Sequence, residues 1–251
     1  MTSYDYVVVG AGTAGCVLAT RLSEDASVRV LLIEAGPADG PLSMADPFAW
    51  KSLLGTEVDW ARTTVPQTGL GGAEFPYPAG KVLGGSSSIN GMFHLRGHRA
   101  NYDGWAESGA TGWSYADLLP YFMRSERAPG RDPRVRGMQG PMLVAPSPWT
   151  SDSALVQDLF GAALDAGIPS TVDPNGRVGD GAGWHDWNIV NGRRQSAADA
   201  YLRPAIDRPN LTVVTEAQVR QLVIENGRCL GVEYTAGAQV RHADAVREVV
   251  L

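Results

Sequence analysis

The chain of 251 residues has few cysteines and no concentration of positive charge. Its two cysteines, Cys16 and Cys229, lie far apart and outside any C-x-x-C spacing, which argues against a disulfide framework and a cysteine-rich metal site. Lysine and arginine number 21 against 27 acidic residues, so the formal net charge is −6. Because such a chain is a poor match for polyanions, we expect neither nucleic acid nor a membrane among its partners.

Long hydrophobic segments are also missing. The first apolar run, residues 7–9, is interrupted at once by Gly10 and is too short for a signal peptide or a membrane span. We therefore expect a cytoplasmic location. With 44% apolar and 19% charged residues, the composition is that of a globular protein of one large domain or two small ones.

The first 33 residues have the pattern of a βαβ unit. Residues 4–9 are aromatic and β-branched, residues 10–15 form a glycine turn, and apolar residues then recur at helical spacing as far as Leu22. Residues 28–33 predict a second buried strand. This order predicts two parallel strands joined by a helix, and hence an α/β fold.

The turn of this unit carries the spacing G-x-G-x-x-G in Gly10, Gly12 and Gly15. In a dinucleotide-binding fold the first glycine makes the tight turn, the second lets a pyrophosphate approach the backbone, and the third lets helix and strand pack closely. Glu34 ends the second strand, where a carboxylate accepts ribose hydroxyls and repels a 2′-phosphate. The pattern therefore favours NAD or FAD over NADP, and a tight turn without a ligand is the alternative.

A second glycine-rich segment covers residues 80–92. It is neither a phosphate-binding loop of the G-x-x-x-x-G-K-[ST] type nor a G-x-S-x-G nucleophile elbow, because Val82 and Ile89 stand at the wrong places. Gly84 and Gly85 allow close backbone approach, and Ser86 is a candidate cap for a helix whose N-terminus faces an anion. The alternative is a capped helix start packed in the core.

The remaining pattern predicts further helices and strands. Three helices are expected. They are residues 114–124, which Pro120 should disturb; a helix capped by residues 151–153 that runs to residue 166; and one that Ser196 opens, with Asp199 at capping-box distance, and that ends near Pro204. The expected strands are residues 211–215, 219–225, 229–234 and 243–251, with Asn226-Gly227 as a hairpin turn.

The segment GKVLGGSSSINGMFHLRG at residues 80–97 and the following YDGW resemble the signature of the glucose–methanol–choline (GMC) oxidoreductases, a family of FAD enzymes. The opening VVVGAGTAGCVLATRLSE and the later NGRRQSAADAYLRPAIDRPNLTVV are similar to that family as well. The resemblance covers nearly the whole chain and is weakest at residues 125–185. It implies a Rossmann-like FAD-binding domain with part of a smaller α+β substrate domain, to which residues of about 144–192 are the candidate contribution.

The resemblance also implies which residues hold FAD. The ADP part would lie against Gly10, Gly12, Thr13, Ala14, Gly15 and Glu34, with Val219 at the adenine. The pyrophosphate and isoalloxazine would lie against Val82, Gly84, Gly85, Asn90, Gly91, Met92 and Phe93. Some members bond the flavin covalently through a histidine next to the asparagine. Ile89 stands there in this chain, so non-covalent FAD is expected.

The reaction implied is the oxidation of an alcohol CH–OH group by hydride transfer to flavin N5, with oxygen or another molecule as electron acceptor. The catalytic histidine of the family follows a more C-terminal signature that this sequence does not contain, so we expect no catalytic residue here and interpret the chain as an N-terminal portion. The alternatives are a hydroxynitrile-lyase-like enzyme that keeps FAD as a structural ligand, an inactive FAD-binding fragment, and an NAD-dependent dehydrogenase.

Other polar residues are weaker candidates for a metal site, a catalytic base or a phosphate contact. His94 and His98 have the spacing of two metal ligands on a helix, but Gly97 interrupts the helix and nothing nearby completes the set, so no metal is expected. His185-Asp186 is a candidate base pair, for which a packed aromatic loop is the favoured alternative. Residues 193 and 194 are both arginine, and they either neutralise phosphates or form a solvated turn.

Overall fold

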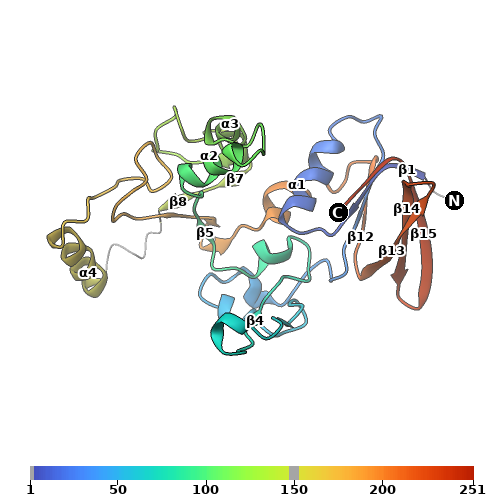
Figure 1. Ribbon diagram of the computed structural model, residues 1–251. Helices are drawn as coiled ribbons and strands as arrows, with labels where there is room; N and C mark the ends of the chain where they lie inside the picture. The colour runs from blue at the N-terminus through green and yellow to red at the C-terminus, as the bar shows by residue number, and fades with distance from the viewer. Residues whose placement is uncertain (1–2, 147–152) are drawn as a thin grey trace. The chain divides into compact units, whose positions relative to one another are not determined.

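The structure is a computed structural model, and it describes residues 3–146 and 153–251 (Figure 1). The chain divides into two compact units. The first combines residues 1–91 with residues 193–251, and the second comprises residues 92–192. The second unit therefore starts well before residue 144, and the assignment of residues 144–192 to a substrate domain stays a prediction.

The first unit is built on a six-stranded mixed sheet with the order β12-β2-β1-β15-β14-β13. Strands β12, β2, β1 and β15 pair in parallel, and β15, β14 and β13 pair antiparallel. The long β15 joins the two parts, because its first half pairs with β14 and its second half with β1. The bounds are β1 Ser3–Val9, β2 Val30–Ile33, β12 Leu211–Val214, β13 Ala217–Glu225, β14 Arg228–Ala236 and β15 Gln239–Val250.

Both faces of the parallel part are covered. The helix α1, Thr13–Leu22, buries Cys16 and Ala19 against Val8 and Leu32 on one face. On the other face Leu31 packs with side chains of β14 and β15. This explains why β2 is an unbroken apolar run rather than an alternating one. The predicted βαβ unit is confirmed, with β2 two residues shorter than the predicted strand.

The turn between β13 and β14 is the predicted Asn-Gly hairpin. Asn226 has φ 50° and Gly227 has φ 78°, which is the pair of positive values that a type I′ turn requires. The last predicted strand is also present, but it begins at Gln239 because a second hairpin, with Gly237 at φ 60°, extends the antiparallel part.

The irregular segment after β2 contains only short elements. They are 3₁₀ turns at Leu42–Ala45, Trp50–Leu53 and Thr68–Leu70, and the two-residue strands β3 Arg62–Thr63 and β4 Pro76–Tyr77. Asp59 ties the segment together, since its carboxylate accepts the backbone N–H groups of Gly55, Ala61 and Ala79. Burial alone would raise the pKa of Asp59, but these three donors outweigh it and lower the pKa.

The second unit consists of helices and very short strands. Its helices are α2 Arg99–Glu107, α3 Tyr115–Ser125 and α4 Ala154–Asp165; its strands are β5 Phe93–His94, β6 Glu126–Arg127, β7 Met142–Leu143, β8 Ala145–Pro146, β9 Asp186–Trp187 and β10 Ile189–Val190. Helix α3 starts from a full capping box between Ser114 and Asp117 and continues through Pro120, so the expected disturbance is wrong. Ser153 is the N-cap residue of α4, and residues 151–152 of the predicted cap lie outside the described residues.

The centre of the second unit is ionic rather than apolar. Arg136 is fully buried and contacts Glu126, Asp173 and Asp186 at 2.7–2.8 Å. Arg96 adds a contact of 2.7 Å to Glu126. Burial would raise the pKa of Glu126, but His94, Arg136 and Arg96 together hold it at about 2. The carboxylate therefore stays ionised in the core. No helix in residues 3–146 or 153–251 is long and apolar enough to cross a membrane.

Candidate functional site: a cradle of two glycine bends

The first bend connects β1 to α1. Gly10 has φ 87°, and a Cβ on Gly15 would lie 1.9 Å from the carbonyl oxygen of Gly10. Only glycine allows helix and strand to approach so closely, as the motif predicted. A Cβ on Gly10 or Gly12 would instead meet nothing within 4 Å. The packing of the protein itself therefore does not require a glycine at position 12. A glycine with open space beside it is expected where a ligand comes close to the backbone.

The second bend is a tight turn and not the start of a long helix. Gly84 has φ 90° and Gly85 has φ 52°, and a four-residue 3₁₀ turn follows at Gly85–Ser88. The expectation that Ser86 caps a helix is wrong: Gly84 is the cap residue, and the Ser86 hydroxyl accepts the N–H of Gly80 at 3.1 Å. The backbone twists too sharply here, with two successive positive φ values, for an α-helix to begin.

The two bends lie directly against each other. The N–H of Gly84 donates to the carbonyl oxygen of Ala11 at 2.7 Å. A Cβ on Gly85 would lie 2.7 Å from the Cα of Gly12, closer than side-chain carbons are found in proteins. The two motifs, separated by about seventy residues in the sequence, thus form one continuous backbone surface.

Glu34 is placed beside this surface by the end of β2. One of its carboxylate oxygens accepts the N–H of Ala11 and the other accepts the N–H of Gly36, both at 2.8 Å. Burial raises the pKa of Glu34, and the N–H donors work against that rise. Glu34 therefore has a structural task that the motif alone did not reveal. Each carboxylate oxygen still has acceptor capacity for a ribose hydroxyl.

A cavity of about 290 Å³ lies beside the first bend. It is lined by three residues predicted for the ADP part of a dinucleotide, Gly10, Gly12 and Glu34, and by the predicted adenine contact Val219. Trp60, which sequence reasoning did not select, also contributes to the wall. The only signal for it was an aromatic residue in a long irregular segment. Open space at Gly12, a carboxylate and an aromatic wall fit the ADP part of FAD.

A third segment, which begins at Ser196, contacts the second bend. The N–H of Ala197 donates to the hydroxyl of Ser87 at 2.9 Å. Ser196 and Asp199 exchange the two hydrogen bonds of a capping box, as their spacing predicted. The element that follows is a π-helix, η5 Ala198–Leu202, and then a 3₁₀ turn, η6 Arg203–Ala205, rather than a regular α-helix.

The other predicted cofactor residues are spread over both units. Thr13 and Ala14 are exposed in the first turn of α1, Val82 is buried, and Asn90 is exposed beside Gly91. Met92 and Phe93 belong to the second unit. Met92 is buried with φ 61°, an unusual value for a residue with a side chain, and Phe93 is 56% exposed. The contacts of all these residues with a flavin stay predictions.

The histidine candidates have partners of their own. His94 contacts Glu126 at 2.9 Å. His98 caps α2 and contacts Asp180 at 3.2 Å. Within the described ranges no group of three or more metal-ligating side chains gathers. Asp186, the neighbour of His185, is held by Arg131 and Arg136. The His185 ring packs against Phe93 and Trp187, with ring centroids 4.6 and 4.8 Å apart, which favours the packed aromatic loop. Burial lowers the pKa of His185.

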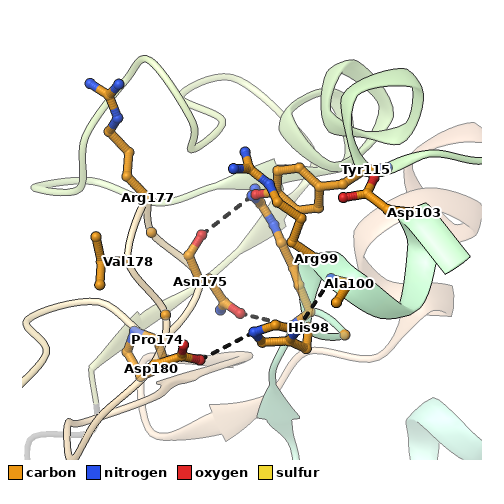
Figure 2. A pocket seen from close by; sticks show the side chains of 14 residues that line it. His98, Arg99, Ala100, Asp103, Tyr115, Pro174, Asn175, Arg177, Val178 and Asp180 are labelled. Carbon is orange, nitrogen blue, oxygen red and sulfur yellow. Dashed lines mark hydrogen bonds and ion pairs between the residues drawn. The ribbon is translucent and has the colours of Figure 1, made fainter.

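The second unit has a cavity of its own, of about 460 Å³, at the start of α2 (Figure 2). Figure 2 shows His98 between the backbone of Ala100 and the carboxylate of Asp180. Three arginines, Arg96, Arg99 and Arg177, line the cavity together with two aspartates, Asp103 and Asp180. The guanidinium of Arg96 also contacts the carboxylate of Glu126. None of the predicted cofactor residues lines this cavity.

Comparison with known proteins gives a consistent result. The family model of the GMC oxidoreductases matches residues 4–251. The chain is 44% identical to an oxygen-dependent choline dehydrogenase of Brucella anthropi and 43% identical to the mitochondrial choline dehydrogenase of Homo sapiens, over 98% and 99% of its own length. It covers 45% and 43% of those proteins, so the chain spans less than half the length of these relatives.

Solved structures agree with the sequence comparison. A pyridoxine 4-oxidase from Mesorbium loti matches with a TM-score of 0.93 at 33% identity, over 98% of this chain and 48% of that one. A formate oxidase of Aspergillus oryzae, solved to study the modification of its FAD, matches with a TM-score of 0.87 at 29% identity, over 100% of this chain and 45% of that one. The matched region is the FAD-binding N-terminal domain of the family.

Proposed function

This chain belongs to the GMC oxidoreductase family, and from that premise we propose that it is the FAD-binding part of an enzyme that oxidises the CH–OH group of an alcohol. The observation that carries the proposal is the contact between Gly12 and Gly85 beside the cavity that Glu34 and Val219 line. A single elongated dinucleotide has its phosphates at such a bend and its adenosine against such a wall.

The flavin, when bound, supplies the acceptor for a hydride from the alcohol carbon. The described residues of this chain bind and orient it. Backbone N–H groups at the start of α1 bring partial positive charge to the pyrophosphate, and Glu34 accepts hydroxyls of the ribose. The two glycine bends keep side chains out of the space that the phosphates would occupy, so the phosphates can approach the backbone closely. Proton transfer from the alcohol is the task of a base that none of the residues discussed above provides.

For the substrate we propose a small alcohol, and the relatives named choline dehydrogenases make choline the first to test. The electron acceptor is oxygen or another small molecule. A cytoplasmic location remains part of the proposal. None of the described residues favours the lyase or the NAD alternative, and both are outcomes of the test below.

The test begins with the visible spectrum of the purified chain after desalting, with and without added FAD. We expect flavin bands that co-purify or are restored by FAD and not by NAD. The chain fused to the second half of the Brucella anthropi relative is then mixed with choline and other alcohols without oxygen. Bleaching of the flavin supports alcohol oxidation, whereas a steady spectrum with release of cyanide from a hydroxynitrile supports the lyase. A chain that binds NAD and no flavin contradicts the proposal.

A further inference from the structure

The first unit has another cavity, of about 710 Å³, at the sheet face where β14 and β15 pack on the parallel strands. The residues at its walls come from four strands: Tyr4 of β1, Thr212 and Val214 of β12, Tyr234 of β14, and Arg241 and Ala243 of β15. None of them lines the cavity beside the first bend. Strand β1 borders one cavity near its start, at Tyr4, and the other at its last residue, Val9, and five residues of extended chain separate the two by ~16 Å.

The walls of this cavity are largely aromatic and aliphatic. Tyr4, Val214, Tyr234 and Ala243 all belong to the apolar cluster on this face of the sheet. Tyr234 is 7% exposed, so its ring is held in place by its neighbours. Sites for small molecules typically measure about 300–1,000 Å³ and combine such walls with a few polar groups. The cavity has the size and the composition of a ligand site.

Three hydroxyl groups at these walls are free to bind a ligand. Within residues 3–146 and 153–251, the side-chain hydroxyls of Tyr4, Thr212 and Tyr234 make no hydrogen bond to the protein. A hydroxyl can both donate and accept, so the three suit a polar group of either kind. Water alone would satisfy the hydroxyls without using the aromatic rings beside them. A ligand with an apolar body and a polar end uses both.

Arg241 adds a positive charge to the same wall. It lies directly opposite Tyr234 in the pairing of β14 with β15, and opposite residues of an antiparallel pair share one face of the sheet. Its guanidinium is exposed and donates to the amide oxygen of Gln239 at 3.4 Å. The neighbouring His242 contacts the carboxylate of Asp244 at 2.8 Å, but within the described residues no carboxylate pairs with Arg241. This cation is therefore available to an anion.

We propose that the cavity binds a small aromatic carboxylate, with the ring of the ligand against Tyr4 and Tyr234 and its carboxylate paired with Arg241. Aromatic rings attract each other in offset or edge-to-face contact, and a guanidinium holds a carboxylate through two parallel hydrogen bonds. A simple inorganic anion would use the charge and leave the rings unused. The site is distinct from the one that carries the proposed function, and it does not depend on that function.

The first test titrates the complete chain with three ligands in a calorimeter. Benzoate is the probe, benzamide has its shape without the charge, and hexanoate has the charge without the ring. We expect benzoate to bind, and the other two to bind at least about tenfold more weakly, because each lacks either the ion pair or the ring contact. Equal affinity for benzamide overturns the pairing with Arg241, and equal affinity for hexanoate overturns the aromatic class. An absence of benzoate binding overturns the site.

Two variants then test the position of the carboxylate. Arg241→Met removes the charge at an exposed position, so we expect about tenfold weaker binding of benzoate and unchanged binding of benzamide. Arg220→Met is the matched control, since Arg220 is exposed on β13 and lies outside the cavity. It should bind benzoate like the unsubstituted chain. Unchanged affinity of Arg241→Met for benzoate contradicts the proposal.

A last comparison separates this cavity from the one beside the first bend. Gly12→Ala places a methyl group in that other cavity, and added FAD is expected to fill it. We expect neither to change the affinity for benzoate. If either abolishes benzoate binding, the probe occupies the cavity beside the first bend and the proposal is wrong. A chain that binds benzoate in this manner but takes up no flavin supports the site and contradicts the proposed function.

Discussion

Gly85 and Gly12 are in backbone contact, so close that a methyl group on Gly85 would lie 2.7 Å from the Cα of Gly12. The contact joins the turn after the first strand to a bend some seventy residues later. A hydrogen bond also links the two bends, because the N–H of Gly84 donates to the carbonyl oxygen of Ala11 at 2.7 Å. The geometry of the phosphate-binding turn is therefore set by two distant segments together.

Substitution of Gly85 by alanine should separate the bends. The new Cβ would collide with backbone, and the residue has φ 52°, so we expect a loss of about 1–3 kcal/mol in the free energy of unfolding and a loss of FAD binding. Gly71→Ala is the matched control, since Gly71 has φ 65° with nothing near its Cβ. It should cost about 1 kcal/mol from backbone strain alone and leave FAD binding intact. If Gly85→Ala and Gly71→Ala lost equal stability in urea denaturation and bound FAD with equal affinity, the predicted clash at Gly85 would be contradicted.

Gly12→Ala should separate ligand binding from folding. Its Cβ meets no protein atom within 4 Å and its φ is −69°, so the stability of the protein without cofactor should change by less than about 0.5 kcal/mol. FAD affinity should fall at least about tenfold, which corresponds to ~1.4 kcal/mol, because the methyl group occupies the approach of the pyrophosphate. Fluorescence titration with FAD measures this. Gly104→Ala, at an open helical position of the second unit, should leave the affinity unchanged.

Glu34→Gln tests the carboxylate that supports the first turn. Glutamine has one acceptor oxygen, so its NH₂ group must face one of the two backbone N–H donors of Ala11 and Gly36. We expect a loss of about 1–3 kcal/mol in stability without cofactor, together with weaker FAD binding. Thermal melts with and without FAD measure both. A variant that keeps its stability and loses only FAD affinity would show that Glu34 acts on the ribose alone.

The sequence predicted the first glycine turn and the Asn-Gly hairpin because both obey local rules. A positive φ or a close backbone approach demands a particular residue, as Gly10, Gly15 and Asn226 illustrate. That the chain belongs to the GMC family is confirmed by the family comparison.

The features that sequence reasoning missed depend on distant partners. Nothing near Trp60 in the sequence indicates that it forms a wall with Val219, because the irregular segment has no period. The burial of Arg194, which is 6% exposed, was equally hidden, since an Arg-Arg pair before a capping serine is compatible with an exposed turn. The continuation of α3 through Pro120 and the four-residue length of the turn after Gly84 show the same limit, since tertiary packing overrode local preference at both places.

The ionic centre of the second unit predicts a specific sensitivity to acid. The pKa of Glu126 is lowered from 4.5 to about 2, so folding favours its ionised form. The stability that it contributes is fully present above pH 4.5 and is lost as the pH falls towards 2. Glu126→Gln leaves Arg136 and Arg96 short of a buried counter-charge and should cost about 3–5 kcal/mol at neutral pH.

The stability difference between Glu126→Gln and the unsubstituted protein should shrink at low pH, because protonation of Glu126 removes the same charge from the unsubstituted protein. Urea denaturation followed by tryptophan fluorescence at pH 7 and pH 3 measures the difference between the two proteins. Glu107→Gln, which changes an exposed carboxylate at the end of α2, is the control and should lose little at either pH. A penalty for Glu126→Gln that is equal at both pH values would mean that the ionised carboxylate does not stabilise the protein through Arg136 and Arg96.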